Sequence, residues 1–172
     1  MMARVYLSLG SNIDRYRHIT AALDALNDAW GPLEISPVYE SESVGFNGSH
    51  FLNLVVGMDT DLGVGELGRE LKALEARNGR VKGAPKFSPR TLDVDILTFD
   101  DLTGRVDNIE LPRAEILENA FVLRPLADLA PGDVHPVCGK TYRALWQAYC
   151  RDQKLWPVAF RWQGRLISAP VD

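Results

Sequence analysis

The sequence is 172 residues long; 46% of the residues are hydrophobic, 24% are charged, and the formal net charge is −4 at pH 7. These values are typical of one globular domain, and the negative charge argues against a general nucleic-acid-binding protein. The chain has no apolar run as long as a membrane helix and no signal-peptide pattern at its start. Cys138 and Cys150 lack metal-binding spacing, so we expect reduced thiols and a cytoplasmic protein.

The N-terminal part of the chain predicts a mixture of strands and helices. Strands are expected where apolar and polar residues alternate, and helices where apolar residues recur every three to four positions. The expected strands cover residues 4–9, 33–42, 51–58 and 91–99, the second interrupted at Pro37, and the expected helices cover residues 15–29 and 62–76. The order β-α-β-β-α-β predicts a ferredoxin-like α+β core, with two helices on one face of an antiparallel sheet.

The rest of the chain predicts additions to that core. A short helical turn, an apolar stretch and a helix are indicated over residues 112–118, 121–126 and 141–149. The C-terminal extension, residues 153–172, contains Trp156, Phe160 and Trp162 and is too apolar for a free tail. Because no repeat or linker interrupts the chain, the sequence predicts a single domain over residues 1–172.

Charged residues are unevenly distributed in one segment. Residues 76–92 contain no acidic side chain but include five basic ones: Arg77, Arg80, Lys82, Lys86 and Arg90. Asp93 and Asp95 follow at once. A basic loop beside paired carboxylates would suit a polyphosphate bound together with a metal ion. The alternative, a solvated surface loop, is the commoner explanation for a run of charge.

The two aspartates belong to the expected strand over residues 91–99. Side chains alternate between the faces of a strand, so Asp93 and Asp95 should share one face and Val94 the other. Paired carboxylates lose solvation and repel each other unless a cation lies beside them, and Mg²⁺ prefers such oxygen ligands. Alternatively, one aspartate pairs with Arg90 and the other is simply exposed. The chain lacks the glycine-rich ATP-binding motifs, so any ATP would be bound by a different architecture.

A longer pattern surrounds these aspartates. The run of residues 88–97, SPRTLDVDIL, resembles the signature of the hydroxymethyldihydropterin pyrophosphokinase family. Shorter agreements occur in the family's order: LGSN at 9–12, FLN at 51–53, LE at 74–75, GRV at 79–81 and FVLRPL at 121–126. The resemblance covers about residues 5–150, and its most specific part is the long run that contains both aspartates.

The resemblance implies a fold, a reaction and a set of site residues. It implies a ferredoxin-like α+β core that uses two Mg²⁺ ions. The reaction is transfer of pyrophosphate from ATP to 6-hydroxymethyl-7,8-dihydropterin in folate biosynthesis, releasing AMP. By position, the metal ligands would be Asp93 and Asp95, and the catalytic cations Arg80, Lys82 and Arg90. Pterin would be bound by Ser41, Val44, Gly45, Phe51, Asn53 and Phe121, and the nucleotide by Glu75, Ile96 and Arg113. From composition alone, Phe51 and Phe121 would be ordinary core residues.

The sequence departs from the family pattern at several positions. Arg113 stands where the family commonly has a histidine that contacts ATP, and Asn119 stands where an arginine is common. Arg113 could restore the charge that Asn119 lacks. The departures leave open a non-catalytic or substrate-shifted paralogue, and the Asp-x-Asp pair alone also allows a metal-dependent transferase that uses nucleotide sugars. We expect a monomer that binds ATP and a hydroxymethyl-dihydropterin.

Overall fold

The computed structural model describes residues 2–42, 50–79 and 91–170. Its strands are β1 (Ala3–Ser11), β2 (Glu34–Ile35), β3 (Val38–Ser41), β4 (Phe51–Thr60), β5 (Asp93–Phe99), β6 (Gly104–Val106), β7 (Ile109–Leu111), β8 (Leu155–Val158), β9 (Phe160–Trp162) and β10 (Arg165–Ser168). Its helices are α1 (Arg15–Trp30), α2 (Val64–Arg77), α3 (Glu115–Glu118), α4 (Ala120–Leu129) and α5 (Tyr142–Ala148). The strand expected over residues 33–42 is divided at Pro37 into β2 and β3, because proline has no N–H to donate to a strand ladder.

The main sheet is antiparallel and has the strand order β5-β1-β4-β3-β8, with β2 also paired to β4. β1 lies between β5 and β4, and its Leu9 is paired with Val94 of β5 on one side and Leu54 of β4 on the other. The order β5-β1-β4-β3, with α1 and α2 as connections, is that of a ferredoxin-like unit. The predicted α+β fold class is therefore confirmed.

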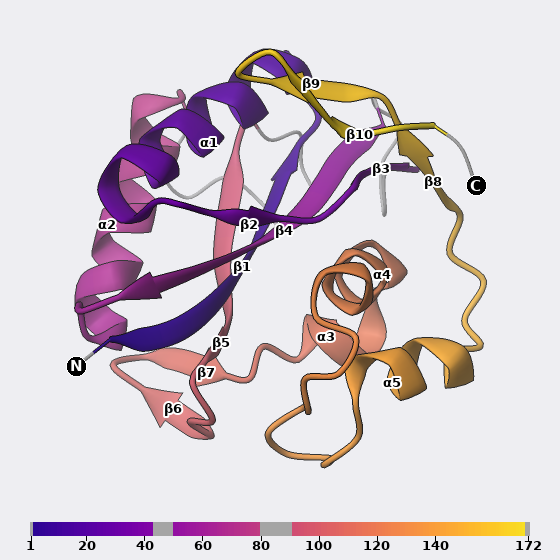
Figure 1. Ribbon diagram of the computed structural model, residues 1–172. Helices are drawn as coiled ribbons and strands as arrows, with labels where there is room; N and C mark the ends of the chain where they lie inside the picture. The colour runs from indigo at the N-terminus through magenta and orange to yellow at the C-terminus, as the bar shows by residue number, and fades with distance from the viewer. Residues whose placement is uncertain (1, 43–49, 80–90, 171–172) are drawn as a thin grey trace.

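Helices cover both faces of this sheet (Figure 1). On one face, α1 and α2 bury apolar side chains such as Leu23 and Leu71 in the main core. On the other face, α4 buries Val122 and Leu126 in a second cluster, which α5 also joins. The apolar stretch at residues 121–126 is thus a buried helix. The sequence did not predict this helix, because it spans only ten residues and contains Pro125, which usually interrupts helices.

The C-terminal extension folds back onto the core. β8 pairs with β3 and so adds a strand to the sheet, while β9 and β10 form a separate hairpin near α1 (Figure 1). Phe160 is 2% exposed, and its ring stacks on Tyr16 of α1 with 5.3 Å between the ring centroids. The aromatic residues of the extension are therefore part of the fold.

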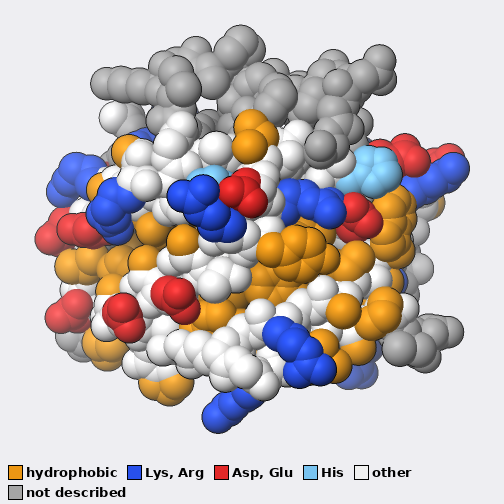
Figure 2. Space-filling model, turned by 90° about the horizontal axis from the view of Figure 1, so that it is seen from above, with side chains coloured by type: hydrophobic (Ala, Val, Ile, Leu, Met, Phe, Trp, Pro, Cys, Tyr) orange, Lys and Arg blue, Asp and Glu red, His pale blue; other side chains and the backbone are white. Residues whose placement is uncertain are grey.

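The face of the molecule seen in Figure 2 carries mixed charge. Figure 2 shows Lys and Arg side chains interleaved with Asp and Glu side chains, with hydrophobic side chains between them. Within residues 2–42, 50–79 and 91–170, none of the helices combines the length and the apolar character that crossing a membrane would require.

Candidate active site

A pocket of about 550 Å³ is lined by the first half of β5, an edge strand of the sheet. One wall comes from α2 and the β6–β7 hairpin, and the other comes from the start of α4. Each predicted site residue within the described part of the chain lines this pocket: Ser41, Phe51, Asn53, Glu75, Asp93, Asp95, Ile96, Arg113 and Phe121. Residues from six separate segments of the sequence therefore meet at one pocket.

The base of the pocket contains a row of three residues on neighbouring strands. The register pairs Gly10 of β1 with Asp93 of β5 on one side and with Asn53 of β4 on the other. Directly paired residues project from the same face of a sheet, so the carboxylate and the amide flank the glycine. A Cβ atom on Gly10 would lie 3.3 Å from Oδ1 of Asn53. The glycine therefore keeps space open between the two polar side chains.

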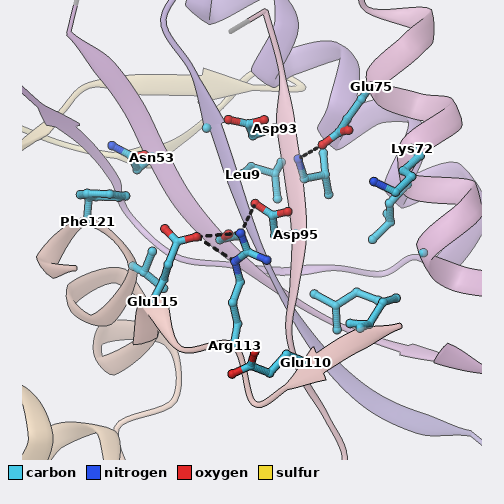
Figure 3. A pocket seen from close by; sticks show the side chains of 18 of the residues that line it. Leu9, Asn53, Lys72, Glu75, Asp93, Asp95, Glu110, Arg113, Glu115 and Phe121 are labelled. Carbon is cyan, nitrogen blue, oxygen red and sulfur yellow. Dashed lines mark hydrogen bonds and ion pairs between the residues drawn. The ribbon is translucent and has the colours of Figure 1, made fainter. Parts of the chain in front are cut away.

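The Asn53 end of the pocket combines a fixed amide with aromatic rings. Nδ2 of Asn53 donates a hydrogen bond of 2.8 Å to Oγ of Ser41, and both residues are buried. This hydrogen bond fixes the orientation of the amide and leaves its Oδ1 beside Gly10. Figure 3 shows Phe121 next to Asn53, and Phe51 lines the pocket from the same strand as Asn53. An amide beside aromatic faces suits a flat heteroaromatic ligand.

Asp93 and Asp95 face the middle of the pocket (Figure 3). Both residues are partly exposed, whereas Val94 between them is 4% exposed and belongs to the main core. The alternation that the sequence predicted for this strand is therefore present. Ser8 of β1 is paired with Asp95 of β5. Because Ser8 and the paired Gly10 are small, they leave room beside the two carboxylates.

Arg113 lies between two carboxylates (Figure 3). Its Nη2 is 2.7 Å from Oε1 of Glu115 and 3.7 Å from Oδ2 of Asp95, and its Nε donates a 2.9 Å hydrogen bond to Glu115. Burial would lower the pKa of Arg113, but the charges of Asp95, Glu115 and Glu110 outweigh burial and raise that pKa. The structure therefore holds a permanent positive charge beside one of the two paired aspartates.

The α2 wall carries Glu75 near the end of the helix. Glu75 is 9% exposed, and its Oε2 accepts a 2.8 Å hydrogen bond from the backbone N–H of Val94. Lys72 lies one turn earlier on the same wall (Figure 3). Ile96 is 5% exposed and belongs to the main core, so only a small part of its surface is available to a ligand. The α2 wall therefore presents both an acidic and a basic side chain to the pocket.

The described lining residues carry more negative than positive charge. Six are acidic and three are basic: Glu42, Glu75, Asp93, Asp95, Glu110 and Glu115 against Lys72, Arg105 and Arg113. A phosphate ligand would be repelled here unless further cations entered with it. Within the described parts of the chain, no three His, Cys, Asp or Glu side chains form a group that could hold a metal ion. The pair Asp93 and Asp95 nevertheless fits Mg²⁺, which often takes its remaining ligands from water and substrate phosphates.

Five of the predicted site residues lie outside the described residues: Val44, Gly45, Arg80, Lys82 and Arg90. Their roles stay predictions. Glu42 and Phe51, near the two ends of the first gap, and Asp93, shortly after the second gap, line the pocket.

The pocket also contains charged residues that the sequence analysis did not predict: Lys72, Arg105, Glu110 and Glu115. Arg105 and Glu110 lie on the β6–β7 hairpin, which was not predicted either. Its two turn residues, Asp107 and Asn108, have φ of 50° and 66°. Asp and Asn are among the residues that favour the positive φ angles of such hairpin turns. Lys72 precedes Glu75 by three positions, so helical spacing could have identified it.

Sequence comparison places the chain among named enzymes. Residues 6–131 match the model of the family described as 7,8-dihydro-6-hydroxymethylpterin-pyrophosphokinase. A relative from Pseudomonas aeruginosa, named 2-amino-4-hydroxy-6-hydroxymethyldihydropteridine pyrophosphokinase, is 40% identical over 135 residues, which are 76% of this chain and 83% of the relative. A relative of the same name from Aquifex aeolicus is 38% identical over 141 residues, 81% of this chain and 88% of the relative. Folic acid synthesis protein fol1 of Schizosaccharomyces pombe is 37% identical over 135 residues, 76% of this chain but 18% of that protein.

Solved structures show the same fold. A crystal structure of a Plasmodium falciparum HPPK-DHPS triple mutant matches 98% of this chain with a TM-score of 0.71 and 16% identity. The wild-type protein with pteroate matches 87% with a TM-score of 0.67 and 17% identity. This chain spans 47% and 42% of those two chains, less than half of their length. At such low identity the likeness supports the fold alone.

Proposed function

The chain belongs to the 7,8-dihydro-6-hydroxymethylpterin-pyrophosphokinase family, and on that premise we propose that it transfers pyrophosphate from ATP to 6-hydroxymethyl-7,8-dihydropterin in folate biosynthesis. The observation that carries the proposal is the position of Asp93 and Asp95. They lie between an end suited to a flat heterocycle, at Asn53 and Phe121, and a polar wall at Glu75 (Figure 3). The phosphates of an ATP molecule held at these aspartates through metal ions would therefore lie next to the pterin end of the pocket.

At the first end, Asn53 would read the edge of the pterin by hydrogen bonds, while Phe51 and Phe121 would pack against its faces. Ser41 supports this role because it holds the Asn53 amide in one orientation before any ligand binds. Val44 and Gly45 are expected to complete this subsite. A preoriented amide reduces the entropy that is lost on binding.

Two Mg²⁺ ions, held by Asp93 and Asp95, would supply positive charge to the phosphate oxygens and help to align the reacting groups. In the transfer, the pterin hydroxymethyl oxygen forms a bond to the β-phosphorus of ATP. The bond from that phosphorus to the oxygen that bridges the α- and β-phosphates breaks, AMP leaves, and the hydroxyl proton is released. The acidic balance of the described lining residues supports a requirement for cations.

The nucleotide would lie along the α2 wall and the β6–β7 hairpin, near Glu75, Ile96 and Arg113. Arg113 already faces Asp95, so a phosphate oxygen that arrives there can accept a hydrogen bond from the same guanidinium. Arg80, Lys82 and Arg90 are expected to stabilise the charge that develops on the transferred group. For such residues, loss of the cation should lower kcat more than it raises KM for the pterin.

The test is product analysis with purified protein, MgATP and the reduced pterin. We expect AMP and the pterin diphosphate in equal amounts, and no product from an Asp95→Asn variant of matched size. Formation of ADP instead of AMP would contradict pyrophosphoryl transfer. Pterin and ATP binding without products would support the non-catalytic alternative, which the named pyrophosphokinases among the relatives do not favour. Binding of a nucleotide sugar without pterin affinity would support the other transferase.

A further inference from the structure

The short junction between α3 and α4 is held by the segment that leads into the C-terminal extension. The carbonyl oxygen of Glu118 accepts hydrogen bonds from the Tyr149 hydroxyl at 2.9 Å and from Arg151 at 3.3 Å. Oε1 of Gln153 accepts a 2.7 Å hydrogen bond from the backbone N–H of Ala120, and its Nε2 donates a 3.1 Å hydrogen bond to Oδ1 of Asn119. These contacts fix the three residues that immediately precede Phe121.

The Ala120 hydrogen bond has a specific structural role. The first N–H groups of a helix have no partner within the helix, so a side-chain acceptor there stabilises the helix start. α4 begins at Ala120, and the side chain of its N-cap residue, Asn119, makes no capping hydrogen bond. Gln153 supplies the acceptor from a distant part of the chain. Because Phe121 is the next residue, the orientation of its backbone depends on this cap.

The extension also contacts the opposite side of the pterin end. β8 pairs with β3, where Leu155 lies opposite Ser41 and Trp156 opposite Glu40. Nε1 of Trp156 donates a 2.9 Å hydrogen bond to Oε1 of Glu40, whose other oxygen accepts a 2.5 Å hydrogen bond from Arg15. Ser41, which fixes the Asn53 amide, is therefore held by the strand next to it.

The extension is anchored independently of these contacts. Phe160 is buried against Tyr16 of α1, and Oγ of Ser168 accepts a 2.8 Å hydrogen bond from the backbone N–H of Val38. Nε1 of Trp162 donates a 2.9 Å hydrogen bond to Oδ1 of Asp24. Loss of one polar contact at Gln153 or Trp156 should therefore leave the extension in place.

From these contacts we propose that the C-terminal extension positions the pterin subsite, with Gln153 acting on Phe121 and Trp156 acting on Ser41. The inference rests on the proposed function for the identity of the ligand. Neither Gln153 nor Trp156 lines the pocket, so both are positioning residues rather than binding residues. The match to the family model ends at residue 131, so the proposed role belongs to a part of the chain outside that match.

The test uses Gln153→Ala and Trp156→Phe, with Trp162→Phe as the matched control. Both tryptophan variants keep an aromatic ring and lose one indole N–H that donates 2.9 Å to a carboxylate, but only Trp156 contacts β3. Calorimetry measures the Kd of 6-hydroxymethylpterin and, separately, of a non-hydrolysable ATP analogue with Mg²⁺. Thermal melting reports whether each variant is folded.

We expect the pterin Kd to rise about three- to tenfold in Gln153→Ala, which removes two hydrogen bonds, and about twofold in Trp156→Phe, which removes one. Trp162→Phe should leave the pterin Kd unchanged, and all three variants should bind the ATP analogue like the wild type. In turnover assays, KM for the pterin should rise more than kcat falls. Gln153→Glu keeps an acceptor for Ala120 at the helix start and should recover most of the affinity.

Equal pterin affinity in wild type, Gln153→Ala and Trp156→Phe would overturn the inference. So would an equal loss in all three variants including Trp162→Phe, because that result would show general destabilisation of the extension. A wild-type protein that binds no pterin would instead overturn the proposed function, and with it this inference.

Discussion

The two ends of the pocket are built in different ways. At the Asn53 end, two neutral groups, the Asn53 amide and the Ser41 hydroxyl, hold each other in place by a hydrogen bond. At the Asp95 end, Arg113 is held between the carboxylates of Asp95 and Glu115. The Asn53 amide is therefore oriented before a ligand arrives. At the charged end, an arriving phosphate must share Arg113 with Asp95, so substitutions there should affect the nucleotide and the chemistry rather than the pterin.

The largest expected effect comes from the paired carboxylates. Asp93→Ala or Asp95→Ala should lower kcat by at least about a hundredfold, because each change removes an expected Mg²⁺ ligand from the reacting phosphates. The fold should persist, since both side chains are partly exposed and relief of their repulsion can offset lost contacts. Steady-state assays with circular dichroism as a folding control make the measurement. Activity within about threefold of wild type in both variants would refute the metal assignment.

The next largest effect concerns Arg113. Arg113→Ala should weaken MgATP binding by about ten- to a hundredfold, equivalent to about 1.5–3 kcal/mol for a charge-assisted hydrogen bond. The pterin Kd should hardly change, because Arg113 contacts neither Asn53 nor Ser41 in the structure. Calorimetric titration with a non-hydrolysable analogue tests both ligands.

A complementary change at Asn119 would sharpen the comparison between the two ends. Asn119→Arg should raise ATP affinity, because the new side chain would add a second positive charge near Glu115. It should also weaken pterin binding, because the amide of Asn119 currently accepts a hydrogen bond from Gln153 at 3.1 Å. If Arg113→Ala bound ATP like wild type and Asn119→Arg gained nothing, Arg113 would not compensate for Asn119, and the nucleotide side would be built differently.

A smaller effect is expected at the boundary between the two ends. Gly10→Ala places a methyl group 3.3 Å from Oδ1 of Asn53, so the amide must shift by a few tenths of an ångström. We expect the pterin Kd to rise by about three- to tenfold, with a stability change within about 1 kcal/mol. Gly132→Ala is the control, because a Cβ there meets nothing within 4 Å. Unchanged pterin affinity in Gly10→Ala would mean that the ligand does not use the Asn53 amide.

The smallest effect is a pH dependence at Glu40. Burial raises the pKa of Glu40, but hydrogen bonds from Arg15 and Trp156 and the charge of Arg15 outweigh it and lower that pKa below its ordinary value of 4.5. The contribution of ionised Glu40 to the free energy of unfolding is fully present above pH 4.5, and it is lost as the pH falls through the lowered pKa. The free energy of unfolding of the wild type should therefore exceed that of Glu40→Gln by about 1 kcal/mol at pH 7. In urea unfolding this difference should shrink at acidic pH, and a constant difference would argue against the ion pair.

Local patterns in the sequence predicted the core of the site, and contacts between distant segments account for what was not predicted. Alternation in one strand was sufficient to place Asp93 and Asp95 on one face. The resemblance added Asn53 and Phe121, which local patterns alone would have left in the core. Gln153 could not be predicted, because its partners lie more than thirty positions away and neither spacing nor composition marks such a contact.

The outer border of β5 has a consequence for self-association. An edge strand exposes backbone groups that can pair with another protein molecule. On β5, the N–H of Val94 donates to the Glu75 carboxylate, and the carbonyl oxygen of Leu97 accepts 2.8 Å from the backbone N–H of Arg113. Glu75 and Arg113, which are both expected to bind the nucleotide, thus also occupy backbone pairing positions along the outer border of β5. Replacing Glu75 with alanine should therefore promote aggregation in concentrated solution, in addition to any effect on turnover.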